Sequence, residues 1–411
     1  MSGFLSRSFY RKSMLLLALL ITGGAFLYNI YVLSALFVVF ALLYMGSSDI
    51  AVFNQRYSKI SWLFVVLVFL AVYHTILNDH FSMSIMIRAI NLVFAYFLLI
   101  CYFGGDPEKE FIGDYIVIGK IITVHALLST LLLAVVPQMF SPMPEHETVY
   151  QSLGILFSCR PSPSNIFFGP HRCMGLFWEP GVLQFFASLF LYILLFQVED
   201  KKANRRWIVV SVVVILLTQS ITGIYLLACI FLFYLVQRKK VIWLTLIALV
   251  ATPLIIDMFR QKFLSDWSGD AGSYWMRLAD SLSAFQVIID HPLFGIGFDN
   301  DDFILLRRSV EYQGVLDADY FWDRGNTNSV LTLFYGLGVP LGIYLITRLY
   351  KQQIFSKQRL LFFIIIVISC ISEPLLLMTF PLFFIFSGMI PRPEVQLEGS
   401  ASSGDDNPVV T

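Results

Sequence analysis

The amino-acid sequence predicts an all-α polytopic membrane protein with about 12 transmembrane helices, in a range of about 10 to 12. Hydrophobic residues make up 57% of the 411 residues, charged residues make up 14%, and the mean hydropathy is +0.75. A water-soluble domain of this length needs a more polar surface than this composition can provide. In addition, the basic residues cluster in short loops between apolar runs. We therefore expect one integral-membrane domain over residues 1–390.

The lengths of the apolar runs predict the individual spans, because about 20 helical residues cross the roughly 30 Å hydrocarbon layer. Runs of ordinary length predict single spans at 60–77, 84–103, 112–136, 174–198, 240–257 and 327–349. Three longer runs contain helix breakers, and we expect each to form two short helices. These runs are 13–46 with Gly23 and Gly24, 207–237 with Ser220 to Gly223, and 359–390 with Pro374 and Pro381.

Basic residues orient these spans, because short cytoplasmic loops are enriched in Lys and Arg. With the N-terminus inside, all the short basic loops, such as the one at 201–206, fall in the cytoplasm. The two long loops, 137–173 and 258–326, are then both external. The tail 391–411 is rich in Pro, Gly, Ser and Asp, and we expect it to be disordered in the cytoplasm.

Cysteine and histidine usage gives no sign of a metal site or a cofactor. No Cys/His cluster in the sequence has the spacing of metal ligands, and no Gly-rich phosphate-binding loop follows a strand. Cys159 and Cys173 both fall in the first external loop, where a disulfide is permitted. Their spacing does not supply the geometry that a disulfide requires, so a bridge and two separate thiols both stay open.

Two ionisable residues mark the start of the span at 174–198. Glu179 lies about two turns inside the expected hydrocarbon edge, where an ionised carboxylate is costly unless it is paired or hydrated. Pro180 is expected to disrupt the helix, and such breaks are tolerated at membrane depth where they line a cavity. Arg172, seven residues before Glu179, would lie on the same helix face. Glu179 is therefore either a functional carboxylate or the structural partner of Arg172.

The second external loop carries the other candidate site. Arg277 precedes an amphipathic stretch, 278–289, which is expected to lie on the membrane surface with its polar side chains, among them Asp280 and Ser283, outward. A planar guanidinium matches phosphate oxygens, so Arg277 suits a lipid-linked phosphate or diphosphate. An arginine that only reaches the membrane interface is the alternative reading.

Other basic residues of the same loop add to the positive field around Arg277. They are Arg260, Arg307, Arg308 and Arg324, each of which also fits a solvated surface charge. His291 is followed by Pro292 and a Gly-rich turn, so it is either a general base or part of a structural corner.

Five motifs follow one another between about residues 170 and 390. They are Arg172-x-x-Gly175 with Glu179-Pro180, Thr218 to Gly223, Arg277 with His291-Pro292-x-x-Gly295-x-Gly297, Asn328-Ser329 leading into Gly336-x-Gly338, and Glu373-Pro374. Their order and spacing resemble the O-antigen polymerase and ligase superfamily, although no single motif is specific. The sequence departs from the family at Ile221, where an arginine is frequent, and at Thr327, where ligases usually carry a histidine. The missing histidine and Glu179-Pro180 favour the polymerase branch.

The resemblance implies a glycosyl transfer at the outer face of the bacterial cytoplasmic membrane, without a metal or another cofactor. The growing chain would leave one undecaprenyl-diphosphate carrier and join a new lipid-linked repeat unit of O-antigen, capsule or exopolysaccharide. Arg172 and Arg277 would stabilise the leaving diphosphate, and Glu179 would orient or deprotonate the acceptor hydroxyl. The remaining candidates are His291 as a weaker base and, for substrate binding, Arg260, Arg308, Arg324, Asn328 and Glu373.

The expected partners are the donor and acceptor lipid-linked oligosaccharides and membrane lipid. A chain-length regulator protein is a further candidate partner, and no nucleic acid is expected. An O-antigen-type ligase, a flippase for lipid-linked oligosaccharide and another transporter are the alternative functions, because many secondary transporters also have twelve spans with both termini inside. Such transporters usually have two similar halves and short external loops, which this sequence lacks. A scaffold without chemistry fits poorly with an intramembrane Glu179.

Reporter fusions test the predicted topology. Fusions at Ser152 and Gly314 should report an external position, and fusions at Ala203, Lys239 and Lys357 a cytoplasmic one, because the basic loops orient the spans. Alkaline phosphatase activity and green fluorescence give the two readouts. A cytoplasmic Gly314 would overturn the external placement of the second long loop.

Overall fold

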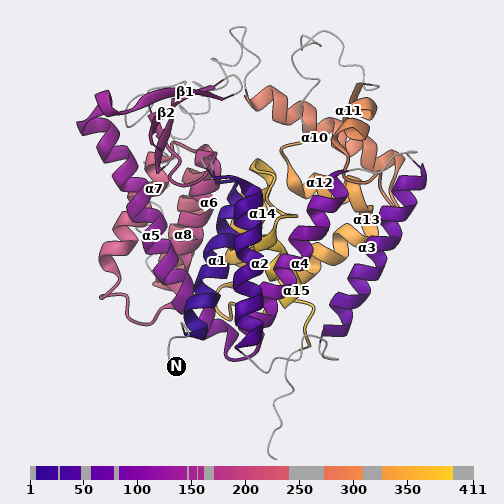
Figure 1. The fold of residues 1–411 in the computed structure, drawn as a ribbon, viewed down its shortest axis with the longest axis horizontal. Coiled ribbons are helices and arrows are strands. Elements are labelled where there is room, and N and C mark those ends of the chain that lie inside the picture. The colour runs from indigo at the N-terminus through magenta and orange to yellow at the C-terminus, as the bar shows by residue number, and fades with distance from the viewer. Residues whose placement is uncertain are drawn as a thin grey trace, which may run out of the picture.

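The computed structural model describes residues 6–25, 28–47, 57–77, 83–145, 148–154, 156–161, 171–239, 273–308 and 326–391. Most of these residues are helical and several of the helices are strongly apolar, which agrees with a helical membrane protein. Figure 1 shows most of the helices running along one direction, with a small sheet at one end.

The helices fall into two groups along the chain. Those of the N-terminal half are α1 (Arg7–Gly23), α2 (Ile30–Gly46), α3 (Ser58–Leu77), α4 (Met83–Phe103), α5 (Pro107–Val135), α6 (Pro180–Tyr192), α7 (Arg205–Leu217) and α8 (Ile221–Gln237). Those of the C-terminal half are α10 (Ser273–Asp290), α11 (Asn300–Arg308), α12 (Ser329–Leu337), α13 (Val339–Tyr350), α14 (Arg359–Ser372) and α15 (Thr379–Ser387). A single π-turn, Ile193–Gln197, extends α6.

Helix lengths agree with many of the expected spans. Among the described residues, four helices are long and apolar enough to cross a membrane: α3, α4, α5 and α6 with its π-turn. The three long apolar runs each form two helices, namely α1 and α2, α7 and α8, and α14 and α15. The single helix expected over 327–349 is instead two, because Gly338, with φ +82°, separates α12 from α13. The expected span 240–257 lies outside the described residues.

The expectation of an all-α fold is wrong in the first long loop. This loop contains a four-stranded antiparallel sheet. Its strands, in order, are β1 (Ser141–Glu145), β2 (Thr148–Leu153), β3 (Phe157–Pro161) and β4 (His171–Cys173). Strands of six residues or fewer in a polar loop show too little periodicity to be found from the sequence. The sheet packs against α5, where His125 Nε2 lies 2.6 Å from the Leu156 carbonyl and the His125 ring stacks on Phe157.

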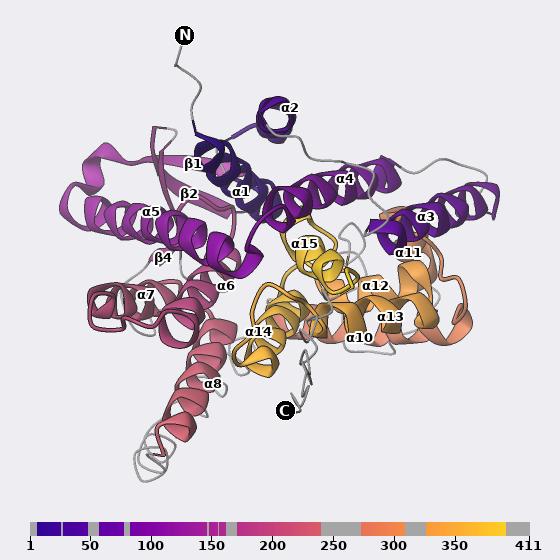
Figure 2. The same ribbon diagram turned by 90° about the horizontal axis from the view of Figure 1, so that it is seen from below.

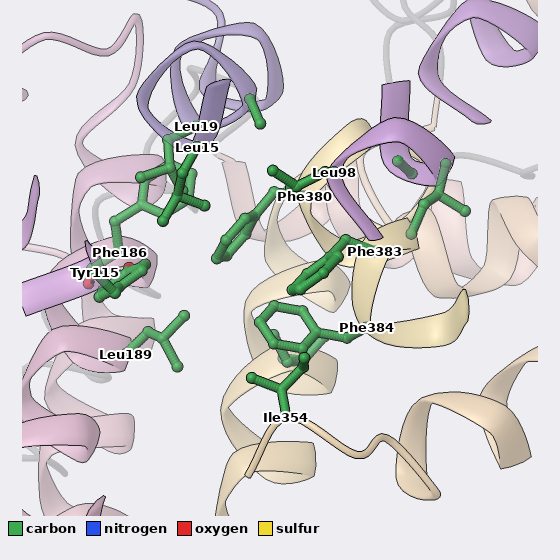
Figure 3. Packing of buried hydrophobic residues seen from close by; sticks show 14 of the residues in the cluster. Leu15, Leu19, Leu98, Tyr115, Phe186, Leu189, Ile354, Phe380, Phe383 and Phe384 are labelled. Carbon is green, nitrogen blue, oxygen red and sulfur yellow. Dashed lines mark hydrogen bonds between the residues drawn. The ribbon is translucent and has the colours of Figure 1, made fainter. Parts of the chain in front are cut away.

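One large cluster of buried apolar side chains joins the helices (Figure 3). Rings from α15 lie near its centre, and Phe380 is 6.0 Å from Tyr115 of α5 and 5.7 Å from Phe186 of α6, measured between ring centroids. All residues of α6 are buried. This helix is therefore fixed on every side, and so is the position of its first residue, Pro180.

An ion-pair network joins α1 to α5 at the end of the molecule where α1 begins. Arg11 contacts Glu110 and Asp114, each at 2.6 Å, and the Tyr102 hydroxyl donates to Asp114 at 3.2 Å. The sheet and α10 lie at the opposite end of the molecule (Figure 1). Seen from below, α15 lies between the side that holds α5 and α7 and the side that holds α3 and α13 (Figure 2). The described parts of the two long loops thus lie at one end of the molecule.

The helix α10 turns its apolar stripe outward. Leu282, Phe285 and Ile289 are 49%, 54% and 69% exposed, whereas Asp280 and Ser283 are buried. The expected outward position of these two polar side chains is therefore wrong. The reason is that α10 packs on α12 through the face that also carries Ala284 and Val287. Its apolar stripe remains available to the membrane interface, as an amphipathic surface helix requires.

The turn after α10 packs backbone to backbone on the junction of α12 and α13. The Ile296 N–H donates to the Tyr335 carbonyl at 2.8 Å. Gly338 combines a positive φ with a close approach, because a β-carbon there would overlap the carbonyl of Leu293. Only glycine satisfies both conditions without strain.

The substitution Gly338→Ala should destabilise the protein by about 1–3 kcal/mol or more, since alanine meets both an unfavourable φ and a backbone overlap. Thermal unfolding of the detergent-solubilised protein measures this loss. The matched control is Gly113→Ala in α5, where an added β-carbon meets nothing within 4 Å. An unfolding temperature for Gly338→Ala equal to that of the control would show that this backbone contact does not form.

Candidate functional site

Two arginines lie side by side on one face of the sheet. Arg160 of β3 and Arg172 of β4 are directly opposite each other in the ladder, next to the opposed pair Cys159 and Cys173. Side chains alternate between the two faces of a strand, so the arginines point to one face and the cysteines to the other. The cysteines face α5, where the Cys173 thiol donates to the Ala126 carbonyl at 3.2 Å. Both thiols are free and buried.

Like charges at opposed strand positions repel each other and require a counter-charge. Glu179 supplies this counter-charge by forming an ion pair with Arg160. The Arg160 side chain is 27% exposed and the Glu179 side chain is 18% exposed. Arg172 is fixed differently, because its Nε donates to the carbonyl of Thr218 at 3.0 Å. Its two terminal nitrogens make no hydrogen bond to any residue that the structure describes.

Glu179 directly precedes α6 and lies outside the helix. Its backbone is extended, with φ −134° and ψ 140°, and its side chain does not cap the helix. Proline suits the first helical position because a backbone N–H there has no acceptor within the helix, so its absence costs no hydrogen bond. Pro180 therefore starts the helix rather than disrupting it. The Trp178 N–H donates to the Gly24 carbonyl at 2.9 Å, which fixes the chain just before Glu179 to the end of α1.

The expected pairing of Glu179 with Arg172 on one helix face is wrong. Because α6 starts only at Pro180, Arg172 lies in β4. The ion-pair partner of Glu179 is Arg160, 19 residues earlier in the chain. Arg160 does not stand out in the sequence because it lies in a polar loop that shows no helical period. Only the register of β3 against β4 places it beside Arg172.

The turn between α7 and α8 supports the strand that carries Arg172. Gln219, in the left-handed region with φ +48°, donates from Nε2 to the His171 carbonyl at 3.2 Å. Ser220 caps the first turn of α8 with its side chain. The turn therefore holds β4 through two successive residues, His171 and Arg172.

Glu373 brings a second carboxylate to the start of α6. It follows α14 directly and is only 9% exposed. Its carboxylate packs on Gly181, where a β-carbon would overlap it. The N-terminus of a helix carries a partial positive charge that favours a nearby carboxylate. The Ser329 hydroxyl, at the start of α12, lies 2.9 Å from the Glu373 carbonyl and 2.7 Å from the Cys370 carbonyl, and so fixes this loop.

Electrostatic interactions join these side chains into one group. The Glu373 carboxylate interacts electrostatically with four charged side chains, which are those of Glu179, Arg277, Arg172 and Arg160. Burial lowers the pKa of the Arg172 guanidinium, the two carboxylates raise it, and the two other arginines lower it. We call these five residues the Arg–Glu cluster. Three guanidinium groups face two carboxylates, so one positive charge remains when both carboxylates are ionised.

Two of the other predicted site residues serve the fold. Asn328 caps α12 by accepting hydrogen bonds from two backbone N–H groups of its first turn. His291 lies at the far end of α10, fourteen residues after Arg277 and thus about 21 Å along the helix axis. Its carbonyl accepts a hydrogen bond from the Gly295 N–H at 3.2 Å, which fits the structural corner.

Three predicted arginines of the second long loop cannot be placed beside the cluster. Arg260 and Arg324 lie outside the described residues. Arg308 is the last residue of α11, and its side chain also lies outside them.

The Arg–Glu cluster can bind an anion and accept a proton. Its guanidinium groups suit phosphate oxygens, and its carboxylates suit a hydroxyl proton. Within the described ranges, no group of three or more His, Cys, Asp or Glu side chains could hold a metal ion. Comparisons of the chain with protein-family models, curated proteins and solved structures gave no match.

Proposed function

We propose that this protein is a polysaccharide polymerase. It transfers a growing glycan from one undecaprenyl-diphosphate carrier to the next lipid-linked repeat unit, at the outer face of the bacterial cytoplasmic membrane. The product is O-antigen, capsule or exopolysaccharide. The apolar helices support a membrane location. The basic loops support cytoplasmic termini, and so an external Arg–Glu cluster.

The observation that carries the proposal is the pairing of Arg160 and Arg172 across β3 and β4, with Arg277 within electrostatic range. Several guanidinium groups at one place suit a diphosphate, because each planar fork can bind two phosphate oxygens. Three motifs of the resemblance also meet at this point. They are the turn at 218–223, Asn328-Ser329 and Glu373-Pro374.

The proposed reaction is a displacement at the anomeric carbon of the growing chain. A hydroxyl of the acceptor sugar gives its proton to a carboxylate, and its oxygen bonds to that carbon. The bond between the carbon and the diphosphate oxygen breaks, and the lipid diphosphate leaves with the electron pair. The arginines stabilise the negative charge that develops on the leaving group.

The two carboxylates are not equivalent, and the geometry favours Glu373 as the base. Glu179 is held by its ion pair with Arg160. Glu373 is more deeply buried, and its carboxylate makes no hydrogen bond or ion pair within the described part of the chain. A desolvated carboxylate takes up a proton more readily than a hydrated one. We therefore assign proton acceptance to Glu373, and to Glu179 the positioning of Arg160.

The substitutions Arg172→Lys and Arg277→Lys test charge against geometry. Each should lower polymerisation by about 100-fold, nearly as much as alanine, because an ammonium cannot reproduce a bidentate fork. Glycan length on gels, at equal protein abundance, gives the readout. Arg205→Lys, at the first residue of α7 and at the opposite end of the molecule, is the matched control. If lysine sustains normal length at both positions, the arginines supply only a general positive field and the diphosphate assignment fails.

The substitution Glu373→Gln tests the reaction itself. Removing the base should slow chain extension by about 100-fold or more. Single repeat units should still be made, exported and attached to their final acceptor, while long chains disappear. Glu108→Gln, whose carboxylate contacts Ser356 away from the cluster, is the control.

The glycan products distinguish the rival functions in the same experiment. Loss of a ligase would leave long chains on the lipid carrier. Loss of a flippase would trap single units on the cytoplasmic leaflet. Long chains of wild-type length in Glu373→Gln would remove this carboxylate from the mechanism.

A further inference from the structure

A separate arginine lies at the far end of the loop that starts with Glu373. Arg88, on the second turn of α4, is partly buried. Its Nη1 donates to the sulfur of Met378 at 3.5 Å, and its Cζ lies 5.8 Å from the centre of the Phe298 ring. Tyr335 of α12 is within electrostatic range. Arg88 therefore lies among side chains of α4, α12 and two loops.

The contacts of Arg88 do not balance its charge. A guanidinium has five N–H donors, and a thioether sulfur is only a weak acceptor. No carboxylate in the described ranges forms an ion pair with Arg88. Arg11, at the other end of the helices, shows what a structural arginine looks like in this protein, because it contacts the carboxylates of Glu110 and Asp114. A cation among apolar helices without such a partner marks a functional site by default.

The surroundings of Arg88 indicate the kind of anion. The outer ends of α3 and α4 and the turn after α10 expose large apolar side chains. These are Ile76, Met83, Met86, Ile87, Leu293 and Phe294. Hydrocarbon chains pack on such a surface, and a phosphate pairs with the guanidinium. The ligand that fits both features carries a phosphate and a hydrocarbon tail.

We propose that Arg88 binds the phosphate group of a lipid, and that this lipid is the acceptor of the polymerase reaction. The acceptor assignment rests on the proposed function, whereas lipid-phosphate binding does not. A polymerase of this kind needs two lipid-linked substrates at once. The Arg–Glu cluster accounts for the donor diphosphate only.

The loop between the two sites gives the proposal its geometry. Glu373 begins the loop within the Arg–Glu cluster, and Met378 ends it beside Arg88. Five residues span at most about 18 Å, so the two sites are neighbours. Asn91, one turn after Arg88, accepts hydrogen bonds from the N–H and hydroxyl of Thr379 at 3.2 and 2.7 Å. The loop is therefore fixed to α4, and sugars of an acceptor held at Arg88 can reach across it to Glu373.

Lipid binding to the full-length protein tests this site. The protein is placed in phosphatidylcholine nanodiscs, titrated with undecaprenyl diphosphate or phosphatidylglycerol, and examined by native mass spectrometry. Wild type should retain two undecaprenyl diphosphate molecules. Arg88→Gln should weaken one of the two by about tenfold or more and leave the other unchanged. Arg277→Gln should weaken only the other, and Lys120→Gln, which removes another cation that lies over an aromatic ring, should weaken neither.

Each outcome bears on a different part of the proposal. Arg88→Lys keeps the positive charge and should retain part of the lipid binding. This result would show that Arg88→Gln loses binding through the missing charge and not through misfolding. If Arg88→Gln binds both probes as wild type does, the lipid-phosphate site is absent. If it loses phosphatidylglycerol and keeps both undecaprenyl diphosphates, the acceptor assignment is wrong. If the protein binds two undecaprenyl diphosphate molecules but makes no polymer, the proposed function is wrong and the lipid-phosphate site at Arg88 still stands.

Discussion

The charged side chains of the Arg–Glu cluster are held at the ends of apolar helices, and their mutual pairing sets how the sheet, the turns and α6 come together. Arg160 and Arg172 lie side by side in the ladder, and Glu179 neutralises one of them. Glu373 lies at the positive end of α6. The buried α6 fixes where this end lies, and a sheet turns both arginines toward it. A helix bundle alone would not place two neighbouring arginines on one face with a shared counter-charge.

The helical fold could be predicted largely from the sequence, because hydrocarbon thickness sets helix length. The predicted limits of α3 and α4 differ from the structure by about two residues at most, within the usual uncertainty of helix ends. The sheet could not be predicted, since its pairing depends on contacts between short polar segments. The candidate site was predictable only in part for the same reason. Glu373 belongs to a motif that the sequence shows, whereas the proximity of Arg160 to Arg172 depends on the register of β3 against β4. For α10 the sequence shows an apolar face, but it does not show that α12 covers the face that carries Asp280 and Ser283.

The motifs of the resemblance contact one another in pairs. Asn328 caps α12, and the adjacent Ser329 holds the loop that follows α14 through its hydroxyl. The glycine turn after His291 packs on the backbone between α12 and α13. These contacts explain the small residues and the short hydroxyl at these positions in this chain, because backbone approaches backbone and larger side chains do not fit. Much of what reads as a functional signature in the sequence is thus the framework that keeps Glu373 and α10 in place.

The contact between Gly24 and Trp178 makes the N-terminal helix part of this framework. All five motifs lie beyond about residue 170, a distribution that by itself would divide the chain into an anchor and a working portion. The Gly24 carbonyl nevertheless positions the residue just before Glu179, and Gly23 packs against Phe177. A fragment that starts at the first motif would lack this support. The described segments before and after residue 170 therefore depend on each other for their positions and are not separable modules.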